Sequence, residues 1–261
     1  MSRGIALHVG VDYIDRDAYR ENYPRWKKKL DGGWLSPLYV CANSARAFGD
    51  IAMHHQFDTI KVLTHEVTVA ALESELLHAA KTLEAGDLLY LSFSGHGVQH
   101  PQEVRTEVDG LHEAWCLYDN LLTDRQLYYW WSRFRPGVRV LVFSDSCCGD
   151  EPTSELTARY AGHNPIVMEG FPIKATVRHI TACKENQEAK ISQDLTLFSR
   201  IILDVWDKGS FQGSYPDFFQ ELKRHPKMSF DQKAQHFVLG DYADHHLEEV
   251  IFSKKWRLFA D

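Results

Sequence analysis

Two short apolar runs, each closed by small residues, constrain the fold of this 261-residue chain most strongly. The first runs from Leu88 to Phe93 between Gly86 and Gly95, and the second from Val138 to Phe143. Neither run alternates between apolar and polar residues, as a strand with one solvent-exposed face would. Both are therefore predicted to be strands that are covered on both faces, as strands in parallel sheets are.

Strand and helix patterns alternate along the whole chain. Together with the two runs above, the other strand candidates are Ile5 to Val9, Thr59 to Leu63, Val177 to Thr181 and Gln235 to Leu239. Helix patterns cover Ser44 to His54, Val69 to Leu83, Asp124 to Phe134, Leu195 to Asp207 and Pro216 to Arg224. This alternation predicts an α/β fold with a central, mostly parallel sheet of about six strands and helices on both faces. The stretch from Val98 to Tyr118 is expected to form a hairpin or loop insertion.

Length and composition favour a single domain over residues 1–261. Hydrophobic residues make up 44% of the chain and charged residues 25%, which is enough to bury a large core. The net charge of −7 disfavours a nucleic-acid partner. No apolar stretch approaches the length of a membrane span, and the first residues lack the apolar run of a secretory signal. Five cysteines without framework spacing indicate a reducing compartment, so we expect a cytoplasmic protein without a membrane partner.

Side chains that are able to perform covalent chemistry follow both central strands. His96 comes directly after the first strand, between Gly95 and Gly97, and Cys147 follows the second. In open α/β sheets, chemistry collects beyond the carboxyl ends of the strands. An imidazole can take the proton of a thiol and later give it to a leaving amine. The pair predicts acyl transfer by a His96/Cys147 dyad, although singly Cys147 could be a small buried hydrophobe and His96 an ordinary core or surface histidine.

The two motifs, SGHG and DSC, resemble those of caspase-like cysteine peptidases in the branch of metacaspases and bacterial orthocaspases. The histidine precedes the cysteine by about 50 residues, as in caspases. Weaker matches fall in the family's order, in the segments IALHVGVD, PLYVCANSARAFGDI, DGLHEAWCLYDNLLTD, VRHITACKENQEAK and DLTLFSRIILDVW. The resemblance covers nearly the whole chain. It implies a caspase-like α/β/α sandwich and a cysteine endopeptidase that acts in a regulated response, such as prokaryotic defence or programmed cell death.

The resemblance also implies roles for residues beside the dyad. Asp145, two residues before Cys147, is implied to lie in the primary pocket and to pair with Arg or Lys of a protein substrate. Charge complementarity agrees, because a buried carboxylate attracts a cation and repels an acidic side chain. The alternative is that Asp145 caps the helix or turn after its strand. The other implied substrate-binding residues are Ser94, Cys41 and Ser44, and the implied oxyanion donors are the backbone N–H groups of Gly97 and Cys147.

Some positions depart from the family pattern. Ser44 and His112 stand where metacaspases carry aspartates, and His112 argues against a bound calcium ion; no other metal or cofactor is predicted. Behind the nucleophile, Cys148 replaces a histidine and Asp150 replaces a small residue. These changes leave open a second hypothesis, a catalytically silent regulatory or interaction module on the same fold. The intact dyad favours the enzyme.

A polar segment, residues 151–174, follows the nucleophile and contains three prolines. Loops of this length without secondary structure are usually functional or mobile. In caspase relatives this region is where activating cleavage often occurs, and Arg159 and Lys174 are the candidate sites for a protease with basic specificity. We therefore expect a zymogen that is processed by itself or by an activating protein or protease.

Overall fold

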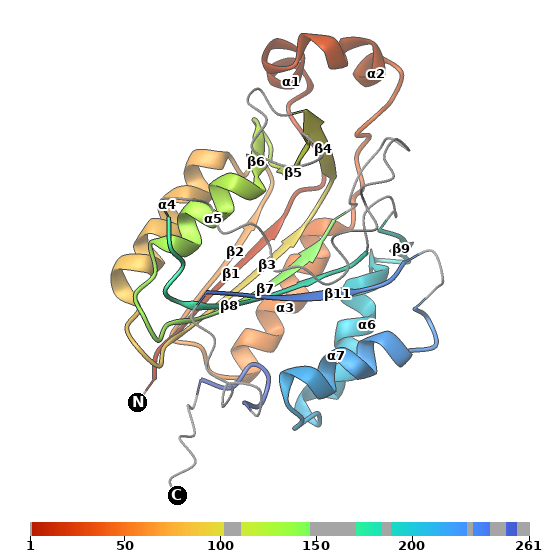
Figure 1. Ribbon diagram of the computed structural model, residues 1–261. Coiled ribbons are helices and arrows are strands. Elements are labelled where there is room, and N and C mark those ends of the chain that lie inside the picture. The colour runs from red at the N-terminus through yellow and green to blue at the C-terminus, as the bar shows by residue number, and fades with distance from the viewer. Residues whose placement is uncertain are drawn as a thin grey trace, which may run out of the picture.

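A single six-stranded sheet forms the centre of the molecule (Figure 1). The structure is a computed structural model that describes residues 2–101, 111–146, 171–183, 189–228, 232–240 and 249–254. All neighbouring strands run parallel except β11, which is antiparallel to β8. The strand order is β11-β8-β7-β3-β1-β2, with β1 at Gly4–Gly10, β2 at Thr59–Thr64, β3 at Leu88–Ser94, β7 at Arg139–Asp145, β8 at Thr176–Thr181 and β11 at Gln235–Gly240. The six predicted strands and the mostly parallel sheet are confirmed.

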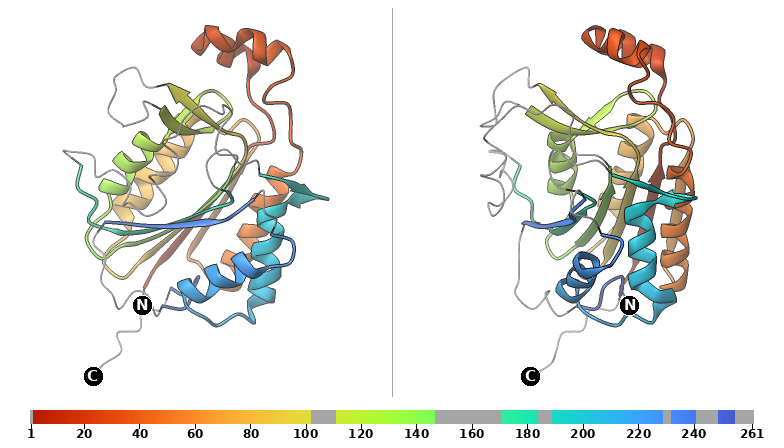
Figure 2. Two further views of the ribbon diagram at one scale, coloured as in Figure 1. Left: turned by 45° about the vertical axis from the view of Figure 1, so that its right-hand side comes forward. Right: turned by 90° about the vertical axis from the view of Figure 1, so that its right-hand side faces the viewer.

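Helices cover both faces of this sheet, as predicted (Figures 1 and 2). One face packs against α4 (Val69–Thr82) and α5 (Asp124–Ser132). The other packs against α3 (Cys41–His54), α6 (Leu197–Trp206) and α7 (Tyr215–Arg224). Side-chain hydroxyls begin four of these helices by accepting backbone N–H groups, from Thr68, Thr123, Thr196 and Ser214. Five predicted helices are thus present in the predicted order.

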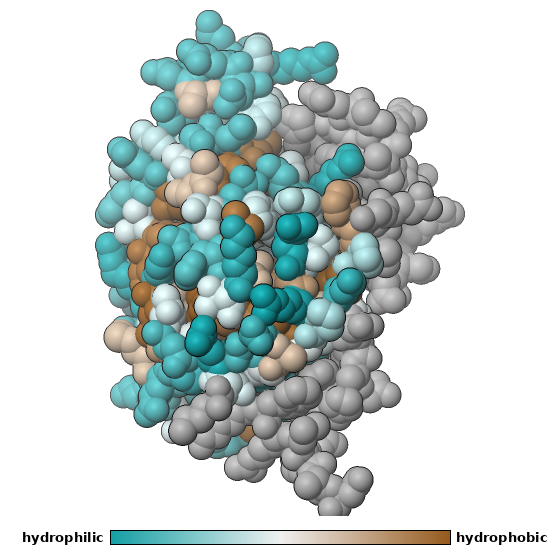
Figure 3. Space-filling view, turned by 90° about the vertical axis from the view of Figure 1, so that its left-hand side faces the viewer, coloured by the Kyte–Doolittle hydropathy of each residue, from teal (hydrophilic) through white to brown (hydrophobic). Residues whose placement is uncertain are grey.

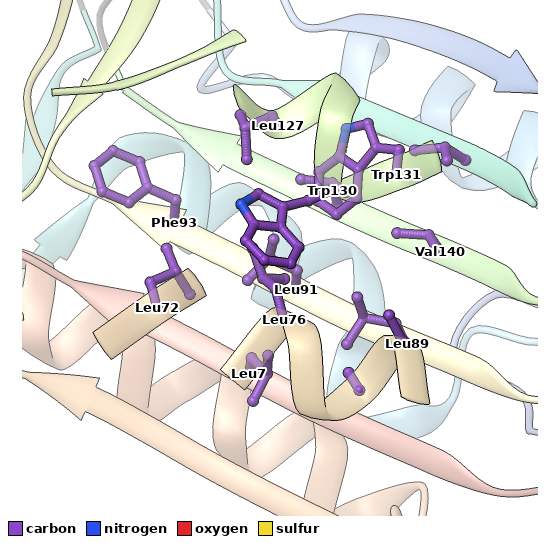
Figure 4. Packing of buried hydrophobic residues seen from close by; sticks show 14 of the residues in the cluster. Leu7, Leu72, Leu76, Leu89, Leu91, Phe93, Leu127, Trp130, Trp131 and Val140 are labelled. Atoms are coloured by element: carbon purple, nitrogen blue, oxygen red, sulfur yellow. The ribbon is translucent and has the colours of Figure 1, made fainter. Parts of the chain in front are cut away.

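The core has two parts because the central strands are buried on both faces. On β1, Ile5, Leu7 and Val9 face α4 and α5, whereas Ala6 and His8 face α3. Figure 4 shows the first part, where leucines of α4 and the indoles of Trp130 and Trp131 lie over the strands. Burial of each such side chain stabilises the fold by about 1.5–3 kcal/mol relative to exposure. The outer surface of this helical layer is mostly hydrophilic (Figure 3).

Two insertions lie beyond the carboxyl ends of the strands. The predicted insertion from Val98 to Tyr118 contains a hairpin of β4 (Gly97–Pro101) and β5 (Leu111–Cys116), which β6 (Leu121–Thr123) extends. The second insertion, residues 12–40, was not predicted. It carries α1 (Arg16–Asn22), the short 3₁₀ helix η1 (Pro24–Trp26) and α2 (Lys27–Asp31), and it projects from the top of the molecule (Figure 2). We call these residues the arm.

Smaller elements complete the described fold. A short hairpin of β9 (Ile191–Ser192) and β10 (Leu195–Thr196) precedes α6, so α6 begins later than predicted. The helix α6 is followed by η3 (Asp207–Gly209). Within the residues described, no helix is long and apolar enough to cross a lipid bilayer. The single-domain organisation of residues 1–261 stays a prediction, since parts of the chain lie outside the description.

Candidate active site

The two central strands end side by side. Ser94 of β3 is in register with Asp145 of β7, and the Gly95 N–H donates to the Asp145 carbonyl at 3.2 Å. The chain therefore leaves both strands at the same edge of the sheet, at His96 and at Ser146. Cys147 is the next residue after Ser146 and lies outside the described residues, so the side-chain geometry of the dyad stays a prediction.

The residue before Cys147 is held firmly in place. Ser146 is buried, and its Oγ lies 3.1 Å from the Oγ of Ser144. The Cys183 thiol donates to the Ser146 carbonyl at 3.2 Å, and the Trp115 indole donates to Ser144 Oγ at 2.9 Å. Packing and hydrogen bonds therefore fix the position of Ser146, the last described residue before Cys147.

The ring of His96 is oriented by a backbone carbonyl of the arm. Its Nε2 lies 2.8 Å from the carbonyl oxygen of Ser36. A carbonyl can only accept, so Nε2 carries the hydrogen and, in the neutral ring, Nδ1 keeps its lone pair. Burial lowers the pKa of His96, an effect that the Ser36 carbonyl partly opposes. At neutral pH the imidazole is therefore neutral, with Nδ1 as its basic atom.

Ser36 lies in a loop with an unusual backbone. Leu35 has a φ of 55° and Tyr39 a φ of 57°, in the left-handed region that side chains other than glycine adopt at a cost. Contacts at both ends hold this loop. At one end, Arg16 of α1 donates to the carbonyls of Leu30, Trp34 and Leu35. At the other end, the Leu38 N–H donates to the Asp12 carbonyl at 2.8 Å.

Asp12 also explains why α3 begins earlier than predicted. Its carboxylate accepts from the N–H of Cys41 at 2.7 Å and of Ala42 at 3.2 Å. Gly10 allows this helix end to approach the sheet, because a Cβ there would lie 2.3 Å from the Cys41 carbonyl oxygen. Cys41, a predicted substrate-binding residue, is fully buried at this contact.

Asp145 lies at the end of β7 with its carboxylate buried beneath the first turn of α6. Only 1% of the residue is exposed. Its Oδ2 accepts from Ser199 N at 3.1 Å, from Ser199 Oγ at 2.6 Å and from Thr196 Oγ1. Burial raises the pKa of Asp145 to about 6, even though these donors oppose the shift. Among the described residues, the helix whose N-terminus Asp145 caps is α6, and the segment from residue 147 onward, to which the capping alternative refers, lies outside the description.

Ser94 and Ser44, two predicted substrate-binding residues, are placed differently with respect to the Asp145 carboxylate. Ser94 is fully buried on the strand beside Asp145, and among the described residues its Oγ has no partner, like Asp145 Oδ1. Ser44 reaches Asp145 only through Thr196: Ser44 Oγ lies 3.2 Å from Thr196 Oγ1, which in turn donates to Asp145. The structure therefore places Ser94 in register with Asp145 on the neighbouring strand, and it links Ser44 to Asp145 through Thr196.

Comparison with known proteins places this chain in a family. The structure of protein GSU0716 from Geobacter sulfurreducens is 30% identical, with a TM-score of 0.78 over 96% of this chain and 98% of that one. Caspase-1 from Spodoptera frugiperda shares the fold, with a TM-score of 0.60 over 92% and 88% of the two chains at 11% identity. Metacaspase-4 from Arabidopsis thaliana is 29% identical over 130 residues, which are 48% of this chain. The chain belongs to the caspase-like family.

These three comparisons support different conclusions about the fold and about the function. The likeness to the insect caspase-1 shows the fold alone, and the caspase-like α/β/α sandwich is thereby confirmed. The chain spans about a third of the length of the curated metacaspase that it matches, 31%. No protein-family model matches the chain. The comparisons therefore show the family and the fold of this caspase-like protein, and its activity and substrates are proposed below.

The remaining predicted site residues of this caspase-like protein are placed only in part. Gly97 follows His96 and begins β4, whereas its predicted oxyanion partner, the Cys147 N–H, lies outside the described residues. Arg159 also lies outside them. Lys174 is exposed, but the next residue, Ala175, is fully buried directly before β8.

A metal site was predicted to be absent, and calcium to be doubtful. Within the described parts of the chain, no three His, Cys, Asp or Glu side chains gather closely enough to hold a metal ion. The acidic stretch at 102–110 and the side chain of His112 are not among the described groups, so calcium binding is open to experiment.

Proposed function

We propose that this caspase-like protein is a cytoplasmic cysteine endopeptidase that cleaves proteins after Lys or Arg. The observation that carries the specificity is the buried Asp145 carboxylate, which has one oxygen without a partner among the described residues. A buried carboxylate is costly until a cation meets it, and a basic substrate side chain supplies that cation. An acidic side chain would be repelled by the same group.

The proposed reaction uses the two residues at the strand ends. Nδ1 of His96 takes the proton of the Cys147 thiol, and the thiolate attacks the carbonyl carbon of the scissile bond. The N–H groups of Gly97 and Cys147 receive the developing oxyanion. The C–N bond breaks as the His96 imidazolium gives its proton to the leaving amine. Water, deprotonated by His96, then hydrolyses the thioester, which releases the acid and restores the thiol.

The direct test compares fluorogenic peptides that carry Lys, Arg or Asp at the cleaved position, with calcium present and with calcium chelated. Cleavage of the basic peptides without cleavage of the Asp peptide supports the proposal. Cleavage after Asp alone would overturn the specificity. No cleavage in any arm, including after limited proteolysis of the purified protein, would favour the silent regulatory module instead.

Processing is part of the proposal, since we expect the protein to be a zymogen with a role in a regulated response. In the described conformation, Asp145 Oδ1 and Ser94 Oγ are shielded from solvent. A substrate side chain therefore reaches them only after the groups that cover them move.

Self-cleavage is expected after Arg159 in preference to Lys174. The bond after Lys174 joins it to the fully buried Ala175, so a protease would have to unfold the start of β8 to reach that bond. Gels of purified wild type, Arg159→Ala, Lys174→Ala and Cys147→Ala after long incubation test this order. Intact wild-type protein would contradict self-cleavage and leave a partner protease as the activator.

Arg16 is expected to support catalysis through the arm. Replacing it by methionine removes the donors that hold the carbonyls next to Ser36, so the carbonyl that orients His96 loses its fixed position. We expect kcat to fall about 10- to 100-fold, as for loss of a group that orients a catalytic residue, with KM changed little. Steady-state kinetics on a basic peptide measure both constants.

Arg20 provides the matched control for Arg16. It lies on the same helix and binds Asp17 and Asp31, without any described contact to the Ser36 loop. Arg20→Met is expected to leave kcat near the wild-type value. Equal losses in the two variants would mean that the arm acts only through general stability.

A further inference from the structure

Only one oxygen of the Asp145 carboxylate has hydrogen-bonding capacity left for a ligand. Oδ2 already accepts from the Ser199 N–H, the Ser199 hydroxyl and the Thr196 hydroxyl. A carboxylate oxygen offers about two lone-pair directions, so three donors leave it no room for a fourth. Oδ1 is buried and has no partner among the described residues.

The hydroxyls around Oδ2 form a relay with a fixed direction. Thr196 Oγ1 gives its hydrogen to Asp145, so in its contact with Ser44 at 3.2 Å it must accept, and Ser44 donates. Ser44 Oγ in turn accepts from the Thr196 N–H at 3.2 Å. The hydroxyl hydrogens of Ser44 and Thr196 thus both point along this series of hydrogen bonds toward Asp145, and Oδ2 has no capacity for a further donor.

A second buried oxygen without a partner among the described residues lies on the neighbouring strand, in Ser94. Ser94 and Asp145 are in register on adjacent parallel strands, so their side chains leave the sheet on the same face. Ser94 is fully buried, and its Oγ also has no partner among the described residues. The site thus presents one carboxylate oxygen and one hydroxyl oxygen to a cation.

These acceptors suit an ammonium group better than a guanidinium group. Arginine gains its advantage from a planar fork that binds both oxygens of a carboxylate, and it leaves costly N–H groups unpaired when buried without enough acceptors. Lysine carries three rotatable donors on one nitrogen, which can bind Oδ1 and Ser94 Oγ together. We infer that the pocket selects lysine over arginine, with Thr196 and Ser199 as the residues that set this preference. The inference rests on the proposed peptidase function and narrows it.

The experiment measures kcat/KM for two peptides that differ only by Lys or Arg at the cleaved position, using the whole chain in its active form. We expect the Lys peptide to be preferred about 3- to 10-fold, which is the net value of one typical hydrogen bond. Equal rates, or a preference for Arg, would overturn the inference while leaving the proposed function intact. Cleavage of neither peptide would overturn both.

Two variants check the assigned atoms. Ser94→Ala removes the second acceptor and is expected to reduce the Lys/Arg ratio of kcat/KM to about 1. The matched control is Ser92→Ala, which removes a hydroxyl from the same strand and face, where it lies 2.9 Å from His8 Nδ1. That variant is expected to keep the wild-type ratio. A ratio that falls equally in both variants, or in neither, would refute the role of Ser94.

Discussion

Replacing Cys147 by alanine or His96 by glutamine is expected to lower kcat/KM for a basic peptide by about 10⁴-fold or more, as for the removal of a nucleophile or its base. Glutamine is the informative choice at position 96. Its amide can still donate to the Ser36 carbonyl, which His96 contacts at 2.8 Å, but it cannot take a proton from a thiol. A loss as large as that of His96→Ala would therefore assign the effect to proton transfer. Steady-state cleavage assays measure it.

Cys148→Ala is the matched control for the nucleophile, since it removes the neighbouring thiol. We expect it to retain most activity, because the proposed mechanism uses only Cys147. Unfolding curves should show that the stability of all these variants stays close to wild type. If Cys147→Ala retained cleavage, or if Cys148→Ala abolished it as completely, the assignment of the nucleophile would be wrong.

The sheet could be predicted from the sequence because its determinants are local. The runs Leu88 to Phe93 and Val138 to Phe143 are apolar on both faces, and the structure buries them on both faces as β3 and β7. Adjacency of β3 and β7 then brings their carboxyl ends together, as the family resemblance implied. The start of α3 was predicted less well, because its cap comes from a distant residue: Asp12 binds the Cys41 N–H across 29 positions.

The supporting residues of the site left no local signal in the sequence. Ser36 contributes a backbone carbonyl, which any residue type could provide, and it reaches His96 across 60 positions. Thr196 is the N-cap of α6, and a local capping pattern carries no information about its contact with Asp145. Only the tertiary fold joins Ser44 to Thr196, 152 positions apart.

Replacing Asp145 by asparagine is expected to affect activity and stability in opposite directions. Cleavage after Lys or Arg should fall about 10²- to 10³-fold, the usual effect of removing one partner of a buried charge pair. The loss should appear mainly in kcat/KM for basic peptides. Peptides with a neutral residue at the cleaved position should be affected far less, which separates loss of the pocket charge from damage to the dyad.

The stability of the same variant follows from the pKa of Asp145, which burial raises from 3.8 to about 6. A raised carboxyl pKa means that the folded state resists ionisation. The protonated Asp145 carboxyl therefore contributes fully to the free energy of unfolding below pH 3.8, and this contribution is lost as pH rises through about 6. Asparagine does not ionise, and its amide N–H replaces the O–H of the protonated acid.

Asp145→Asn should thus be more stable than wild type at pH 8, by on the order of 3 kcal/mol, with about half of that difference left at pH 5. Urea unfolding of both proteins at the two pH values measures it. Burial lowers the pKa of His8 to about 3, so buried histidines of this kind make each protein more stable as pH rises, opposite to the effect of Asp145. Their contribution is the same in both proteins and cancels in the difference between the two free energies of unfolding. A variant less stable than wild type at pH 8 would show that Thr196 and Ser199 bind the carboxylate strongly enough to offset its burial. Asp145 would then stabilise the fold, and the view that its unpaired oxygen is kept for a substrate cation would lose its energetic basis.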